Sequence, residues 1–140
     1  MHNLTGVVGV AAGGVHSLAN LSTSTMTGRI TFVGRTNYWD CARISLKDTS
    51  TGTVTNYEVL TDNAGNYSVS GVPASSSHVL CYSPTYLRRM VTPVIVPLGG
   101  TVTVDFLNLK PGDLNDSNAV TWLDIAPFSA GYGSTGDSLP

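Results

Sequence analysis

Charged side chains are scarce in this chain. Only 11% of its 140 residues are charged, and the formal net charge is −2. Lysine is nearly absent, and glutamate occurs once, at Glu58. Because no basic stripe exists, nucleic acid is not an expected partner. No apolar run approaches the ~20 residues that a membrane-spanning helix needs, so we expect no membrane insertion.

Catalytic signatures are missing as well. His2, His16 and His78 are scattered, and none lies at metal-ligand spacing from another His or Cys. The chain contains no G-x-S-x-G, no H-E-x-x-H and no glycine-rich phosphate loop. We therefore expect a protein that is not an enzyme.

Cysteine is limited to Cys41 and Cys81. In an oxidising compartment they would form one disulfide, which contributes about 3–4 kcal/mol in the chain-entropy model. The alternative is two free thiols that pack as small apolar residues. We favour the disulfide, because abundant Thr, Ser, Gly and Val suit a secreted bacterial surface protein. The apolar start of the chain lacks the basic region of a signal peptide, so we expect no cleavage there.

Alternating apolar and polar residues predict strands between residues 27 and 109. The sequence DNAG at 62–65 is a strong turn signal. Pro93 and Pro97 place the sixth predicted strand at a sheet edge, or break it in two. The predicted strands are 28–33, 41–46, 53–60, 66–72, 78–82, 87–96 and 101–109. Short strands at this spacing predict an all-β, seven-stranded antiparallel Greek-key sandwich.

Five segments resemble the carboxypeptidase-regulatory-like, transthyretin-like sandwich domains of bacterial extracellular proteins. They are TGRITF at 27–32, RISLKD at 43–48, TDNAGNYSVSGVP at 61–73, a strand with LRR at 87–89 and TVTVDFLNL at 101–109. In that family a D-x-x-G-x-[YF] stretch links two central strands, and residues 62–72 fit it without a gap. The resemblance implies a structural or binding domain over residues 27–110.

The sequence GDLNDSNAVTWLD at 112–124 has the spacing of a calcium loop. A hard cation takes six to eight oxygens at ~2.3–2.6 Å, and a 12-residue loop can supply them. An apolar run follows, as an exit helix would. The predicted ligands are Asp113, Asn115, Ser117, Thr121 and Asp124 through their side chains, and Ala119 through its carbonyl.

This segment resembles one repeat of a dockerin, over residues 112–133. Ser117 stands where dockerins usually have Asp, and Asn118 where Gly is frequent, although Asn tolerates a left-handed backbone. Pro127 would bend or shorten the exit helix. Dockerins carry two such repeats and this chain has one. The alternative is a turn and helix that keep the shape without the ion.

Residues 1–26 carry no charge apart from histidine. Val8, Val10 and Ala12 recur every second residue, which suits an extended strand laid along the sheet edge of another subunit. Head-to-tail donation of this kind builds a helical filament. The alternatives are an eighth strand of the same sandwich and a short helix at 15–21.

Two features suggest glycans. Tyr38, Trp39, Tyr82 and Tyr86 could form an aromatic platform for a sugar ring, or they could be ordinary core residues. Separately, N-x-[ST] sequons predict glycosylation in an exposed protein. The candidate sites are Asn3, Asn20 and Asn66, with a fourth sequon at Asn115 that conflicts with a calcium-ligand role.

Together these features predict an extracellular or cell-surface protein in three parts: an extension at 1–26, a sandwich at 27–110 and a calcium appendage at 111–140. The main hypothesis is a structural filament subunit assembled by strand donation. The alternative is a secreted binding or attachment module that binds glycans or docks as dockerins do.

Overall fold

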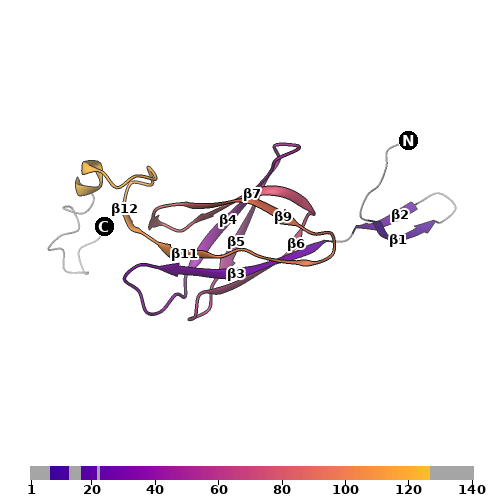
Figure 1. Cartoon of the computed structure of the whole chain (residues 1–140), viewed down its shortest axis with the longest axis horizontal. Helices are drawn as coiled ribbons and strands as arrows, with labels where there is room; N and C mark the ends of the chain where they lie inside the picture. Colours follow the sequence, from indigo (N-terminus) through magenta and orange to yellow (C-terminus); the bar gives the residue numbers. More distant parts are fainter. Residues whose placement is uncertain (1–6, 13–16, 22, 127–140) are drawn as a thin grey trace, which may run out of the picture.

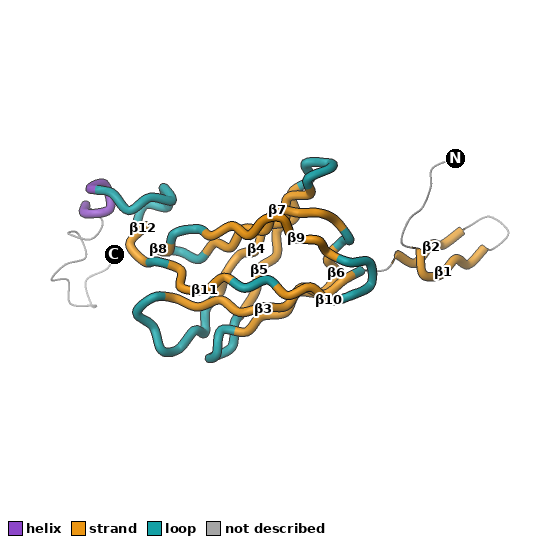
Figure 2. The backbone as a smooth tube through the Cα atoms, in the orientation of Figure 1, coloured by secondary structure: helices purple, strands orange, loops and turns teal. Residues whose placement is uncertain are grey.

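The computed structural model describes residues 7–12, 17–21 and 23–126, and strands make up most of them (Figures 1 and 2). One short 3-10 helix, η1, follows the last strand. The elements are β1 Val7–Ala12, β2 Ser17–Leu21, β3 Ser24–Phe32, β4 Cys41–Asp48, β5 Val54–Leu60, β6 Asn66–Val72, β7 Ser75–Tyr82, β8 Thr85–Tyr86, β9 Arg89–Val96, β10 Thr101–Thr103, β11 Phe106–Leu109, β12 Pro111–Asp113 and η1 Trp122–Asp124.

Two sheets form the predicted sandwich. One has the order β5-β4-β7-β9, and in the other β3 lies between β6 and the pair β10 and β11. Apolar side chains at every second position of the strands fill the space between the two sheets. On β4, for example, Ala42, Ile44 and Leu46 are buried, whereas Cys41 and Arg43 are exposed. The all-β sandwich is therefore confirmed, with β10 and β11 in place of the last predicted strand.

The last strand differs from the prediction in its direction. β10 and β11 run parallel to β3, with Thr101 opposite Thr25 and Phe106 opposite Ile30. A purely antiparallel arrangement is thus wrong here. The last strand reaches β3 by crossing over from β9 in the other sheet, so no hairpin with β3 sets its direction.

A glycine in β3 allows this close approach. A Cβ atom on Gly28 would lie 1.8 Å from the carbonyl oxygen of Val104, which directly follows β10. The same carbonyl accepts a 2.6 Å hydrogen bond from the buried Tyr67 hydroxyl. Burial raises the pKa of Tyr67.

Edge and terminal pairings place the C-terminal loop. β9 is an edge strand, as Pro93 and Pro97 predict. β8 and β12 pair antiparallel, with Asp113 opposite Thr85, and this brings residues after 113 against the end of the sandwich. Among the described residues, no helix has the length and apolar character needed to cross a membrane.

The N-terminal segment forms a hairpin rather than a lone donor strand. β1, which contains Val8, Val10 and Ala12, pairs antiparallel with β2, so hydrogen bonds already occupy one of its edges. β2 lies where the alternative placed a helix, and that alternative is wrong. β3 begins at Ser24, before the predicted boundary at residue 27.

Candidate functional site

Asp113 closes the loop that follows β12. Its carboxylate is 1% exposed. Oδ1 accepts a hydrogen bond from Ser117 N and Oδ2 one from Asn118 N, both at 2.8 Å. Asp116 and Asn118 have φ of 57° and 61°, so Asn118 takes the left-handed conformation expected where Gly is frequent.

Asp124 closes the loop from its other end. It forms a capping box with Thr121, which begins η1 as the N-cap residue. Oδ2 accepts from Thr121 N at 2.7 Å, and Oδ1 accepts from Leu114 N at 2.8 Å. These backbone donors, Thr121 first, lower the pKa of Asp124. A three-residue 3-10 helix starts at Trp122, and most of the predicted exit helix lies outside the described residues, so that helix stays a prediction.

The loop offers oxygen donors only, which is the ligand type of a hard cation. Ser117 Oγ donates to the Ala119 carbonyl at 3.1 Å, and Asn115 Oδ1 accepts from Ser117 N. Over the described ranges, no group of three or more His, Cys, Asp or Glu side chains is assembled for a metal. The two carboxylates that close the loop, Asp113 and Asp124, would need neutral oxygens as co-ligands, and calcium binding stays a prediction.

Tyr82 and Arg88 fasten the loop to the sandwich. The Tyr82 hydroxyl donates to Asp116 Oδ2 at 2.8 Å, and this hydrogen bond raises the pKa of Tyr82. Arg88 N donates to Asn118 Oδ1 at 2.7 Å. The guanidinium groups of Arg43 and Arg88 lie 5.9 and 5.2 Å from the Tyr82 ring centroid. The sequence did not reveal these contacts, because they join segments about 30 residues apart.

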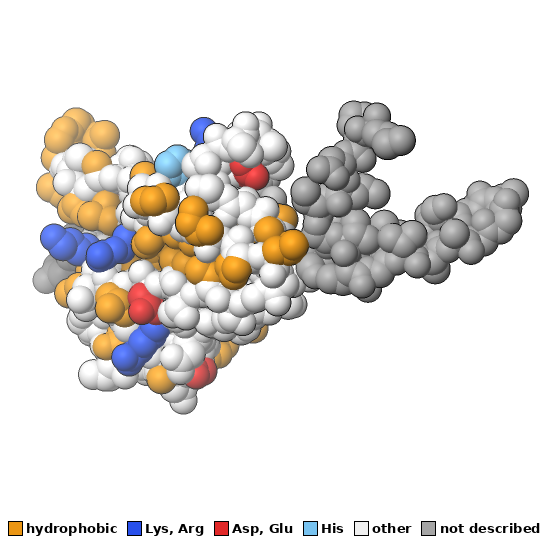
Figure 3. Space-filling view, turned by 45° about the vertical axis from the view of Figure 1, so that its right-hand side comes forward, with side chains coloured by type: hydrophobic (Ala, Val, Ile, Leu, Met, Phe, Trp, Pro, Cys, Tyr) orange, Lys and Arg blue, Asp and Glu red, His pale blue; other side chains and the backbone are white. Residues whose placement is uncertain are grey.

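Four apolar side chains in the last part of the loop and directly after it remain in solvent, and we call them the apolar ridge. They are Val120, Trp122, Leu123 and Ile125, exposed by 56%, 76%, 50% and 61%. Figure 3 shows hydrophobic side chains gathered at the end of the molecule that carries this segment. Folding buries little of this apolar surface, although hydrogen bonds hold the backbone beneath it.

The predicted disulfide is wrong: Cys41 and Cys81 are free thiols. Cys81 lies opposite Ile44 and is buried on the core face of the sheet. Cys41, an odd number of residues before Ile44, is exposed on the outer face. Side chains alternate along a strand, so the two thiols point to opposite sides of the sheet.

The predicted aromatic platform does not form as a unit. Tyr86 packs on Phe32 at a centroid distance of 4.6 Å, and the Tyr82 hydroxyl donates to Asp116 of the C-terminal loop. Tyr38 packs against the core. Of the four aromatic residues predicted for the platform, only Trp39 is well exposed, at 58%.

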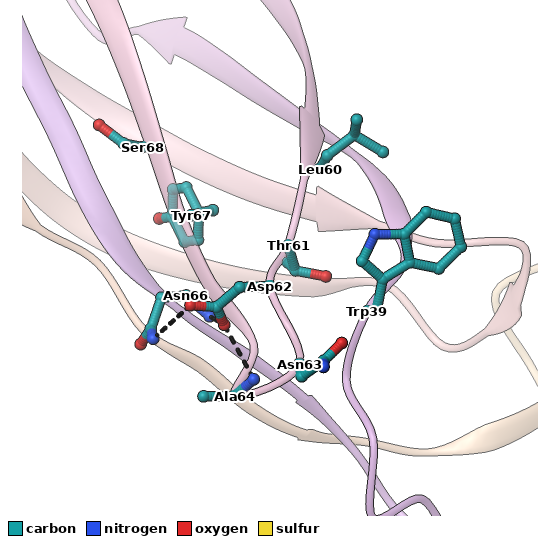
Figure 4. Close-up of a pocket in the computed structure, with 9 residues that line it drawn as sticks. All are labelled: Trp39, Leu60, Thr61, Asp62, Asn63, Ala64, Asn66, Tyr67 and Ser68. Atoms are coloured by element: carbon teal, nitrogen blue, oxygen red, sulfur yellow. Dashed lines mark hydrogen bonds between the residues drawn. The ribbon is translucent and has the colours of Figure 1, made fainter.

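Trp39 stands beside a shallow hollow of about 950 Å³ between the 35–40 loop and the β5–β6 turn (Figure 4). Asp62 organises that turn. Its carboxylate accepts from Ala64 N, Asn66 N and Asn66 Nδ2 at 2.8–2.9 Å. Of the predicted glycosylation sites, Asn66 is exposed at the hollow, Asn20 lies on β2, and Asn3 is outside the described residues.

Comparisons with known proteins show the fold. No protein-family model matches the chain, and no curated protein matches it by sequence. Two solved structures of type II Cohesin-X-Dockerin complexes from Acetivibrio cellulolyticus are similar. An N-terminal interface mutant has a TM-score of 0.52 and 16% identity over 81% of this chain and 76% of that chain. A C-terminal interface mutant has a TM-score of 0.50 and 17% identity over 76% and 72%.

A third structure, a proposed carbohydrate binding protein from Bacteroides uniformis, has a TM-score of 0.46 and 19% identity. The alignment covers 64% of this chain and 42% of that one, so this chain spans less than half of its length. At 16–17% identity, the likeness to the two structures from the Cohesin-X-Dockerin complexes establishes a shared β-sandwich and no more. Membership of the two families named from the sequence stays a hypothesis.

Proposed function

We propose that this chain is a secreted docking module whose apolar ridge binds a protein partner. The observation that carries the proposal is the contrast at residues 120–125. Four apolar side chains are at least half exposed, while Asp113 and Asp124 fix the loop beneath them. Burial of exposed apolar side chains against a partner is favourable. Because the backbone beneath them is already fixed, binding loses little conformational entropy of the loop.

The connection to the sandwich also supports docking. Because Tyr82 and Arg88 hold Asp116 and Asn118, the sandwich positions the ridge. The likeness to chains from Cohesin-X-Dockerin complexes supports the same proposal, as a likeness of fold. The filament hypothesis has less support, because it needs a free donor strand and β1 is already paired with β2.

Calcium is the ion that this proposal includes. It would be held by the six predicted ligands at 113–124, and when bound it would neutralise two carboxylates and stiffen the loop. The chain's own hydrogen bonds to Asp113 and Asp124 already give the loop its path. Calcium would therefore add rigidity to a loop that is largely formed.

The test uses a type II cohesin as the probe. Isothermal titration calorimetry is run in calcium and again with a chelator, and it should show binding. Trp122→Ala should weaken that binding about tenfold or more, as expected when a large exposed aromatic side chain lies in an interface. Trp39→Ala is the matched control, since it removes the other exposed indole and should leave the affinity unchanged. Absence of binding by the intact chain, or equal affinity for Trp122→Ala, would contradict the proposal.

A further inference from the structure

Trp39 combines an exposed indole with a tightly held backbone. Its N–H donates to Asn37 Oδ1 at 2.9 Å, and its carbonyl accepts from Arg35 Nη2 at 3.1 Å. The residue before it, Tyr38, donates its N–H to the Asn63 carbonyl at 3.1 Å. Folding thus orders the backbone around a large apolar side chain without burying that side chain.

A buried hydroxyl joins the two walls of the hollow. Thr61 is 2% exposed. Its Oγ1 donates to the Tyr38 carbonyl at 2.5 Å and accepts from Asp40 N at 2.8 Å. The loop that carries Trp39 is therefore fixed to the end of β5, and the hollow is formed before any ligand arrives.

The opposite wall is equally fixed. Gly65 has φ +87°, and a Cβ atom there would lie 2.2 Å from the Ile30 carbonyl oxygen, so the β5–β6 turn packs directly on β3. Asp62 uses its oxygens within the turn, on Ala64 and Asn66. The side chains of Asn63 and Ser68 are exposed at the hollow. Figure 4 shows the Trp39 ring standing above this turn, near Leu60.

This set of groups matches a sugar ring. A pyranose presents C–H groups on its faces, which pack on an aromatic ring, and hydroxyls at its rim, which pair with amides and hydroxyls. Charge narrows the class of sugar. The described residues that line the hollow include Asp62 and no lysine or arginine, while the nearby Arg29 and Arg35 donate to the carbonyls of Ala64 and Trp39. The lining therefore offers no cation to pair with an anionic sugar. The hollow is open and shallow, which suits the middle of a chain rather than its end.

We propose that the hollow at Trp39 binds a ring of a neutral polysaccharide, stacked on the indole and hydrogen-bonded by Asn63. This site lies apart from the apolar ridge and does not depend on the docking function. The chain would then hold a polysaccharide through the 39–68 region and a protein partner through residues 120–125.

Nuclear magnetic resonance can test this directly, because the chain has two tryptophans and therefore two indole N–H signals. Trp39→Phe and Trp122→Phe assign the signals. The probes are cellohexaose, xylohexaose and mannohexaose, added to the intact chain at up to millimolar concentrations. We expect at least one probe to shift the Trp39 indole signal saturably and to leave that of Trp122 in place.

Variants then identify the contacts. Trp39→Ala should weaken binding about tenfold or more, Asn63→Ala should weaken it less, and Trp122→Ala should leave it unchanged. Backbone amide spectra establish that each variant is folded. The proposal is overturned if none of the three probes shifts the Trp39 signal, or if binding survives Trp39→Ala. Neither result affects the cohesin experiment, so the two proposals fail separately.

Discussion

Thr61 shows how much one hydroxyl can organise. It is buried, and it satisfies both the Tyr38 carbonyl and the Asp40 N–H. Replacing it with valine keeps the shape and leaves both groups without that partner. We expect Thr61→Val to lower the free energy of unfolding by about 1–3 kcal/mol, measured by urea denaturation. Thr53→Val, at an exposed position, is the control, and equal stability of the two variants would contradict the role of Thr61.

The two cysteines should react very differently. Burial raises the pKa of Cys81 to about 12, whereas Cys41 is exposed. The thiolate is the reactive form, so a thiol reagent should modify only Cys41 in the native protein and both cysteines after denaturation. Mass spectrometry after a short pulse of iodoacetamide measures this. Cys41→Ser should be unreactive while folded. Labelling of Cys81 in the native protein would contradict its burial in the core.

At the scale of elements, the β5–β6 turn should respond to acid. The Asn66 side chain and nearby N–H groups lower the pKa of Asp62 below its ordinary value of 3.8. A lowered folded pKa means that the carboxylate stabilises the turn above pH 3.8, and that this stabilisation is lost as the pH falls through the lower folded value.

The amide signals of Ala64 and Asn66 report this transition in a pH titration, because both amides donate to Asp62. We expect a midpoint below 3.8 in the intact chain, and no such transition in Asp62→Asn. A midpoint at or above that value would mean that the hydrogen bonds do not favour the charged form.

Elements defined by local patterns were predictable, and their partners were not. Period-2 alternation located the strands of the sandwich, and the spacing from Asp113 to Asp124 located a loop that does form. The parallel pairing of β10 and β11 with β3 depends on a crossover that no local pattern records.

The same limit applies to the candidate sites. The Tyr82–Asp116 contact and the hollow at Trp39 each join segments distant in sequence. For the cysteines, the alternation of side chains along β4 places Cys41 on the face opposite the buried residues. This would have excluded the disulfide, but only with knowledge that β4 pairs with β7, which carries Cys81.

At the scale of the whole molecule, the N-terminal hairpin should be dispensable for folding. β1 and β2 pair only with each other among the described strands, and β3 starts at Ser24. A chain that starts at Thr23 should therefore unfold at the same urea concentration as the full chain. Sedimentation velocity of both chains tests strand donation. If the full chain polymerises and the shortened chain is a monomer, the filament hypothesis is restored.

The parallel pairing of the first and last sandwich strands has a mechanical consequence. The chain enters the sandwich at one end through β3 and leaves at the other through β11 and β12 (Figure 1). Tension applied between those points pulls β3 and β11 past each other along their length, so several ladder hydrogen bonds carry the load together instead of opening one by one. A sandwich tethered by these two ends would therefore resist stretching through the pairing of β3 with β10 and β11.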